Sequence, residues 1–236
     1  MTKSRVIVAL DFSTASQALD FTQRIDPSLC RLKVGLELYT VAGPAIVEKL
    51  AGRGFDVFLD LKFHDIPTTV AKACRQACDL GAWMINVHAL GGPAMLAAAR
   101  DAVDTATHRP ILVGVTVLTS HDGNELTQIG LRDDASFEVM RLAKLVHTAG
   151  LDGVVCSGHE APRLRESLGE RFTLVTPGIR PRGVAIDDQR RTMTPAEAAS
   201  AGSDYLVIGR PITQASDPVR VLGDIDRDLR AMAPET

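Results

Sequence analysis

The chain has 236 residues, of which 45% are hydrophobic and 23% are charged, a balance typical of a globular protein with a large buried core. Its formal net charge of −3 argues against general nucleic-acid binding, and an aromatic content of 4% argues against a base-stacking platform. No apolar run approaches the length of a membrane span, and the N-terminal run is too short for a signal sequence, so we expect a cytoplasmic protein with no nucleic-acid and no membrane partner.

Short apolar runs alternate along the chain with longer amphipathic runs. The apolar runs predict eight strands, at residues 6–10, 32–36, 57–61, 84–88, 111–117, 153–156, 173–176 and 205–208. The amphipathic runs predict one helix after each strand, at residues 16–25, 44–53, 68–80, 93–103, 136–149, 160–168, 195–201 and 218–232. Several of these helices begin at Pro or Ser and are followed by Gly, as helix ends often are.

The spacing of the first four predicted strands is nearly constant, because they begin at residues 6, 32, 57 and 84. A steady strand–helix period of this size is typical of a parallel sheet wrapped by helices. Eight such units, in a chain close to the ~250 residues usual for this architecture, predict an α/β fold. We expect a single (β/α)₈ TIM-barrel domain over residues 1–236, with a doubly wound open sheet as the alternative.

Two connections are longer than the others. One covers residues 118–134 and includes a predicted short helix near residues 125–129, and the other covers residues 178–194 and is rich in Arg, Gly and Pro. Long connections inside a compact domain are usually lids or binding loops.

The four cysteines are Cys30, Cys74, Cys78 and Cys156. Cys74 and Cys78 are four residues apart, which differs from the two-residue gap of redox and zinc pairs. They share an apolar stripe of the predicted helix, so we interpret the cysteines as buried, reduced core residues.

The third predicted strand carries charges at its end. Asp60 and Lys62 are two residues apart and therefore point to the same face of a strand, with Leu61 on the other face. Such charges are costly to bury unless they pair or take part in chemistry. Asp65 follows closely, and a lysine flanked by two carboxylates stays in its charged form, which suits an acid that meets developing negative charge.

Other predicted strands also end in residues capable of chemistry, and the active sites of barrels lie at the carboxyl ends of the strands. These residues are Asp11, Lys33, His88, Thr119 and Ser120. Simpler structural interpretations stay open for several: Asp11 could cap the next helix, Lys33 could extend from a strand end, and His88 could be a hydrogen-bonded structural histidine. We favour a structural interpretation for His88 and also for His64.

The histidines show no paired ligand spacing. His159-Glu160 begins like a zinc-protease motif, but Arg163 stands where the second histidine would be required. The sequence therefore predicts no metal site, and it contains neither a dinucleotide fingerprint nor a P-loop.

The connections after the seventh and eighth predicted strands each place glycine beside arginine, in TPGIR (176–180) and IGRPI (208–212). Glycine lets backbone N–H groups approach an anion, and arginine offers a planar pair of donors. Barrels commonly hold phosphate after these two strands, so phosphate binding is favoured over plain surface turns.

Taken together, these residues resemble the orotidine 5′-phosphate decarboxylase family over nearly the whole chain. The resemblance rests on ALDF (9–12), LKVG (32–35), DLKFHDIP (60–67), TPGIRP (176–181) and IGRPI (208–212). DLKFHDIP is the most specific of these segments.

The resemblance implies an enzyme that decarboxylates orotidine 5′-monophosphate to UMP in pyrimidine biosynthesis, without metal or organic cofactor. It implies a homodimer in which Asp65 and Thr69 reach the site of the neighbouring subunit. The residues that match the family's catalytic array are Lys33, Asp60, Lys62 and Asp65. The residues that match its substrate contacts are Asp11 and Lys33 for the ribose, Thr119 and Ser120 for the pyrimidine, Arg180, Gln189, Gly209 and Arg210 for the phosphate, together with Pro177 and Thr69.

In this interpretation Lys62 stabilises and then protonates a carbanion at C6 of the pyrimidine. The main alternative is a sister family of metal-dependent barrels that decarboxylate or epimerise sugar phosphates, because it shares an Asp-x-Lys-x-x-Asp core. The FHDIP continuation and the connection that bears Gln189 favour the nucleotide enzyme. A second alternative is an inactive barrel that binds a nucleotide and regulates a partner.

Overall fold

A computed structural model describes residues 4–181 and 192–231. Its eight parallel strands close into one barrel, in which strands adjacent in the chain are adjacent in space and the last pairs with the first. The strands are β1 (Val6–Ala9), β2 (Arg31–Gly35), β3 (Val57–Phe63), β4 (Met84–His88), β5 (Ile111–Val115), β6 (Gly153–Val155), β7 (Thr173–Thr176) and β8 (Tyr205–Ile208). The predicted (β/α)₈ barrel is thereby confirmed, and the open sheet is wrong.

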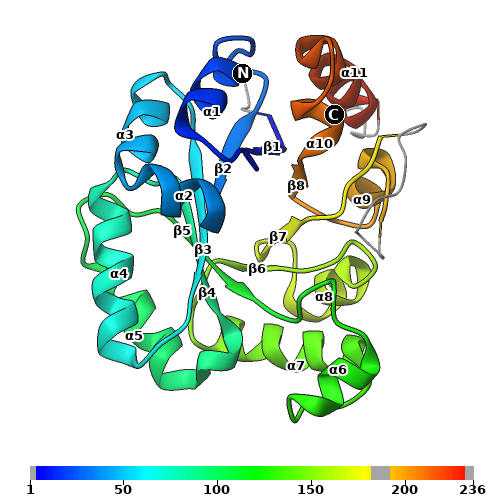
Figure 1. The fold of residues 1–236 in the computed structure, drawn as a ribbon. Coiled ribbons are helices and arrows are strands. Elements are labelled where there is room, and N and C mark those ends of the chain that lie inside the picture. The colour runs from blue at the N-terminus through cyan, green and yellow to red at the C-terminus, as the bar shows by residue number, and fades with distance from the viewer. Residues whose placement is uncertain (1–3, 182–191, 232–236) are drawn as a thin grey trace.

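Helices surround the strands, and the chain runs once around the ring from blue to red in Figure 1. They are α1 (Ala15–Thr22), α2 (Leu36–Ala42), α3 (Ala45–Gly52), α4 (Pro67–Asp79), η1 (Ala89–Gly91), α5 (Gly92–Asp104), α6 (Gly123–Gln128), α7 (Ala135–Thr148), α8 (Ala161–Leu168), α9 (Pro195–Ser200), α10 (Arg210–Thr213) and α11 (Pro218–Arg230). Each predicted helix is present with shifted ends, whereas α2, η1 and α10 were not predicted. The helices η1 and α10, with three and four residues, are too short to show a helical period in the sequence. Helix α2 follows β2 without a break, so the apolar run of the strand continues into it at Leu36.

The apolar residues form two concentric layers. Alternate residues of β1 separate between them: Val6 and Val8 point outward against the helices, and Ile7 and Ala9 point into the barrel. The inner layer is completed by residues of five further strands, namely Phe58, Met84, Val113, Val175 and Val207. This inner layer fills the barrel below the site, so the strand ends are held on a packed core.

The amino end of the barrel is covered by Arg31, Trp83 and Tyr205. The guanidinium of Arg31 lies 4.4 Å from the Trp83 ring centre and 5.1 Å from that of Tyr205, and its Nε lies 3.3 Å from Oδ2 of Asp56. Such cation–π contacts stabilise a partly desolvated charge. These side chains were not singled out by the sequence.

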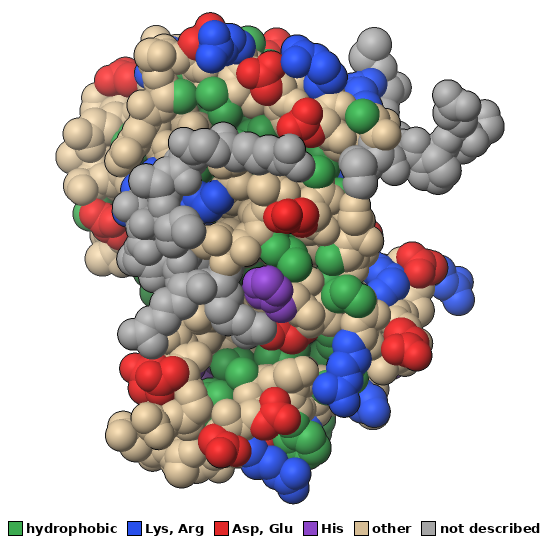
Figure 2. All heavy atoms as spheres, turned by 90° about the vertical axis from the view of Figure 1, so that its right-hand side faces the viewer, with side chains coloured by type: hydrophobic (Ala, Val, Ile, Leu, Met, Phe, Trp, Pro, Cys, Tyr) green, Lys and Arg blue, Asp and Glu red, His purple; other side chains and the backbone are tan. Residues whose placement is uncertain are grey.

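The face of the molecule on the right-hand side of Figure 1 mixes acidic and basic side chains over its coloured part (Figure 2). No helix in the described ranges is long and apolar enough to cross a membrane. All four cysteines are buried free thiols, as predicted.

Candidate active site

A cavity of about 340 Å³ opens at the carboxyl ends of the strands. Most of the residues that the sequence singled out line it together: Asp11, Lys33, Asp60, Lys62, Thr119, Ser120, Pro177, Arg180, Gly209 and Arg210. They come from segments up to 199 residues apart in the chain, and closure of the barrel brings them to one mouth.

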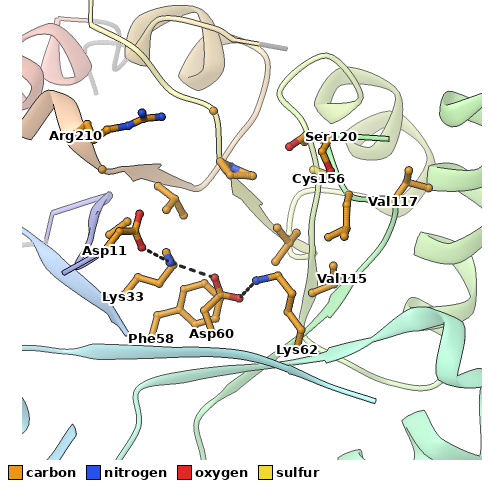
Figure 3. A pocket seen from close by; sticks show the side chains of 18 of the residues that line it. Asp11, Lys33, Phe58, Asp60, Lys62, Val115, Val117, Ser120, Cys156 and Arg210 are labelled. Atoms are coloured by element: carbon orange, nitrogen blue, oxygen red, sulfur yellow. Dashed lines mark hydrogen bonds and ion pairs between the residues drawn. The ribbon is translucent and has the colours of Figure 1, made fainter. Parts of the chain in front are cut away.

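Four charged side chains form a continuous row along the floor of this cavity (Figure 3). Nζ of Lys33 lies 3.4 Å from Oδ1 of Asp11 and 3.4 Å from Oδ2 of Asp60, and Nζ of Lys62 donates to Oδ1 of Asp60 at 2.7 Å. Positive and negative charges therefore alternate, and each oxygen of Asp60 faces a different ammonium group. The predicted pairing of Asp60 with Lys62 is present, and Leu61 packs on the outer side as expected.

The middle of the row is its most buried part. The side chain of Asp11 is 62% exposed and that of Lys62 is 31% exposed, whereas those of Lys33 and Asp60 are each 12% exposed. Burial raises the pKa of Asp60, but the charges of Lys33 and Lys62 and the hydrogen bonds from Lys62 and Asn86 outweigh it and bring that pKa below its ordinary value. Asp60 is therefore a buried carboxylate that stays ionised because two cations and a hydrogen-bond donor surround it.

Asp11 does not cap α1, so that simpler interpretation is wrong. The cap is Thr14, whose side chain accepts a hydrogen bond from the backbone N–H of Gln17 at 3.3 Å. Asp11 is left to pair with Lys33 across the cavity. Gly35 adds to this arrangement, because a Cβ there would lie 3.1 Å from the Lys33 ammonium.

The opposite side of the cavity offers donors to an anion. The Nε of Arg180 is buried and has no hydrogen-bond partner in the part of the chain that the structure describes. Gly178 has a φ of 78°, which a residue with a side chain rarely adopts. The backbone N–H of Arg180 donates to the carbonyl of Met193 at 2.9 Å, so the two ends of the long connection after β7 are tied together beside the cavity.

Figure 3 shows how the groups are ordered across the cavity. Arg210 lies beyond Asp11 at one side, Lys62 lies at the other end of the charged row, and Ser120 lies on that same side. The cavity thus has a cationic end, a charged floor and a far end where one ammonium group meets an apolar wall.

Comparison with known proteins decides the family. Residues 4–225 match the family described as "Orotidine 5'-phosphate decarboxylase / HUMPS family". The chain belongs to this family. Proteins named orotidine 5'-phosphate decarboxylase from Laribacter hongkongensis and Hydrogenovibrio crunogenus are 59% and 56% identical to it over 228 and 225 residues, covering 97% and 95% of this chain and 94% and 95% of theirs.

Solved structures agree with this assignment. The crystal structure of orotidine 5'-phosphate decarboxylase from Lactobacillus acidophilus superimposes with a TM-score of 0.85 at 39% identity, covering 95% of this chain and 98% of that one. An uncharacterized conserved protein from Geobacillus kaustophilus gives a TM-score of 0.83, also at 39% identity, with coverage of 95% and 99%.

Two residues that the decarboxylase resemblance assigns to the site do not line the cavity of this chain. Asp65 and Thr69 are exposed and do not line it, although both lie close after β3. Gln189 falls outside the described residues.

His64 and His88 also do not line the cavity. Their rings stack with centres 5.5 Å apart, and Nδ1 of His88 is buried without a hydrogen-bond partner among the described residues, so the predicted hydrogen-bonded histidine is wrong at that nitrogen. Burial and the nearby His64 and Lys62 lower the pKa of His88 to about 4.

Several lining residues of this family member were missed by sequence reasoning. They are the apolar side chains Phe58, Val115, Val117, Val155 and Val207, together with Cys156. Cys156 was predicted as a core residue and is buried, but it also borders the cavity. The available signal was position, since all of them except Phe58, the second residue of β3, lie near or just beyond the carboxyl end of a strand. Nothing in their chemistry distinguishes them from core residues.

Within residues 4–181 and 192–231, no three His, Cys, Asp or Glu side chains are grouped so that they could hold a metal ion.

Proposed function

We propose that this protein decarboxylates orotidine 5′-monophosphate to UMP in pyrimidine biosynthesis, without a metal or organic cofactor. The observation that carries the proposal is the Lys62 ammonium, held 2.7 Å from Asp60 at the apolar end of the cavity in a chain 55–59% identical to proteins named for this reaction. The same relatives make the metal-dependent sugar-phosphate alternative the less favoured one.

The chemistry requires a cation where Lys62 stands. When the bond between C6 of the pyrimidine and the carboxylate breaks, CO₂ leaves and the electron pair stays on C6, with no adjacent carbonyl to delocalise it well. Lys62 stabilises this carbanion and then transfers one ammonium proton to C6, which gives UMP and a neutral amine that solvent reprotonates. Asp60 holds the Lys62 ammonium group in position through their ion pair, and Lys33 pairs with the other oxygen of Asp60.

The ion pair between Lys62 and the carbanion can supply only part of the required reduction in the reaction barrier. Two opposite unit charges about 4 Å apart attract by about 4 kcal/mol at an effective dielectric constant near 20. Very slow reactions demand about 20 kcal/mol or more of barrier reduction. Most of that must come from a preorganised site and from binding energy of the remote phosphate. Repulsion between Asp60 and the departing carboxylate is a smaller contribution in this proposal.

The order of groups across the cavity supports one orientation of the nucleotide. We assign the phosphate to Arg180, Gly209 and Arg210, with Pro177 beside them in the cavity lining. Gln189, which the resemblance also assigns to the phosphate, lies outside the described residues. The buried Nε of Arg180 supports this assignment, because an anion would supply its missing partner. We assign the ribose to Asp11 and Lys33, and the pyrimidine to Thr119 and Ser120 beside Lys62.

We further propose a cytoplasmic homodimer in which Asp65 and Thr69 complete the partner's site. Large apolar side chains support a covered surface beside this mouth: Ile66 is 65% exposed, and Leu36 and Val41 in α2 are 59% and 60% exposed. Asp65 lies next to Ile66, so a partner seated there would receive its carboxylate. The four free thiols fit a reducing compartment.

The experiment is a spectrophotometric assay of the purified protein with orotidine 5′-monophosphate in the presence of EDTA. We expect the substrate absorbance to fall at the same rate with and without the chelator, and one equivalent of CO₂ to be released per UMP formed. Activity lost to EDTA and restored by a divalent metal would support the sister family instead. Nucleotide binding without release of CO₂ would support the inactive barrel.

A further inference from the structure

The backbone of Lys62 has an unusual conformation. Its φ is 52°, and it is the only residue other than glycine with a positive φ in the described ranges. The left-handed region costs an L-residue about 1–2 kcal/mol, so surrounding contacts must hold Lys62 there. The pairing of β3 with β4 is also irregular at this point, because the register shifts between Leu59 and Phe63.

The side chain of Asn86 in β4 supplies those contacts. It is fully buried, with 0% exposure. Its Oδ1 accepts a hydrogen bond from the backbone N–H of Lys62 at 2.8 Å, and its Nδ2 donates to Oδ1 of Asp60 at 2.6 Å. The Asn86 amide oxygen therefore accepts the hydrogen bond of the Lys62 backbone N–H where the regular hydrogen bonding between β3 and β4 is interrupted.

The two bonds fix the two partners of the central ion pair at once. Oδ1 of Asp60 receives Nδ2 of Asn86 and also Nζ of Lys62, which lies 2.7 Å away. One amide thus anchors the backbone from which the Lys62 side chain starts and the carboxylate at which its ammonium group ends. A primary amide is suited to this position because it carries an acceptor and a donor on one planar group.

We propose that Asn86 is a positioning residue for the decarboxylation: it holds the left-handed turn at Lys62 and orients Asp60, so that the ammonium group is fixed before substrate arrives. This inference rests on the proposed function for its kinetic consequence, but the geometry it predicts does not depend on turnover. Asn86 does not line the cavity, so it acts through Lys62 and Asp60 and not on the nucleotide.

The first test compares Asn86→Ala with Ser203→Ala. Ser203 is also fully buried and shares a hydrogen bond of 2.7 Å with Thr176, so its variant controls for the loss of a buried hydrogen bond elsewhere in the barrel. At a temperature where both variants are folded, we expect kcat to fall about 100-fold or more in Asn86→Ala, while the affinity for UMP changes less than about threefold. Ser203→Ala should keep the wild-type kcat.

A second variant, Asn86→Asp, tests the hydrogen bond to Asp60 separately from the hydrogen bond to the Lys62 N–H, with less risk of misfolding than Asn86→Ala. Asn86→Asp is nearly isosteric and keeps an acceptor for the Lys62 N–H, but when ionised it cannot donate to Asp60 and repels it. When the introduced carboxyl is protonated, it can donate again. We therefore expect kcat relative to wild type to rise as the pH is lowered from about 9 to about 5; a ratio independent of pH would overturn the orienting role.

The crystal structure of Asn86→Ala provides a readout without substrate. We expect Lys62 to leave the left-handed region and its contact with Asp60 to lengthen. If both features persist, or if kcat stays within about threefold of wild type, the inference is wrong. If the wild-type protein shows no turnover at all, the proposed function fails, and the crystal structure still decides the role of Asn86.

Discussion

Lys62 and Asp60 form the closest ion pair of the charged row, at 2.7 Å. Because the ammonium group is proposed to act on the reacting carbon and not to bind the phosphate, Lys62→Ala should abolish decarboxylation and leave UMP binding measurable. Turnover would be followed by absorbance and UMP binding by calorimetry, with Lys144→Ala, an exposed lysine of α7, as the control. Residual turnover near the wild-type rate would exclude Lys62 as the proton donor.

Arg210 stands at the opposite end of the cavity from Lys62 (Figure 3). If it binds the phosphate, Arg210→Ala should raise KM and lower kcat/KM strongly for orotidine 5′-monophosphate, because remote binding energy is lost. The same variant should have little effect on orotidine, which has no phosphate. Arg220→Ala, which removes an exposed arginine of α11, is the matched control. Equal losses with both substrates would mean that Arg210 does not contact the phosphate.

His88, which lies near Lys62, should make the folding stability of the protein depend on pH. Its pKa is lowered from 6.5 to about 4, so the folded protein holds it neutral while the unfolded chain binds a proton between these values. Stability should therefore fall as the pH drops from about 6.5 towards 4, by about 1–2 kcal/mol after solvent screening is allowed for. Urea unfolding at about pH 7 and about pH 4.5 should show a smaller difference for His88→Gln than for wild type, whereas the exposed His147→Gln should behave as wild type. An unchanged difference in His88→Gln would assign the pH dependence to other groups.

The residues of the site divide by how visible they are in the sequence. Asp60 and Lys62 are visible because charges at the end of an apolar strand are unusual and because strand alternation places them on one face. Asn86 is not visible, since a polar residue within Met84–His88 could face any of several neighbours. Its role depends on the register shift between β3 and β4, which is a tertiary feature.

At the scale of the elements, the strands leave little room where β6 meets β7. A Cβ on Gly153 would lie 2.0 Å from the carbonyl oxygen of Thr173, a backbone atom that cannot move without disturbing the sheet. Gly153→Ala should therefore destabilise the protein by about 3 kcal/mol or more. Gly223→Ala in α11 meets nothing within 4 Å and should stabilise it by about 0.5–1 kcal/mol. Thermal unfolding of the two variants measures both; a Gly153→Ala protein as stable as wild type would contradict the steric argument.

The sequence predicts the eight strands and the eight main helices because apolar runs alternate with amphipathic runs along the chain. It misses α2, which follows β2 without a break, because the apolar run of the strand continues into it at Leu36 and because two of its apolar side chains, Leu36 and Val41, are exposed and form no buried stripe. It also places the end of the fifth strand at residue 117, whereas β5 ends at Val115. Val117 continues the apolar run, but it lines the cavity mouth and not the sheet.

At the scale of the whole molecule, the barrel can be predicted from the strand–helix repeat, whereas the association of two chains into a dimer cannot. The proposed shared site can be tested by mixing subunits of inactive Lys62→Ala with subunits of inactive Asp65→Ala. If Asp65 acts on the partner's site, a hybrid dimer has one intact site, and an equal mixture should recover about a quarter of wild-type activity. Subunit exchange would be verified by native mass spectrometry.

The control for this mixture pairs Lys62→Ala with Asp60→Ala, two residues that line the same cavity of one chain. Each site of that hybrid lacks one of them, so no activity should return. Recovery in neither mixture after full exchange would mean that Asp65 does not complete the partner's site.

The cluster of Arg31, Trp83 and Tyr205 covers the amino end of the barrel, while the charged row occupies the carboxyl end. Contacts that stabilise the fold therefore lie at one end of the barrel and the reactive groups at the other, with the packed interior between them. Directed evolution towards heat tolerance can work on the first end without altering turnover, and changes of substrate preference can be sought on the second without rebuilding the scaffold.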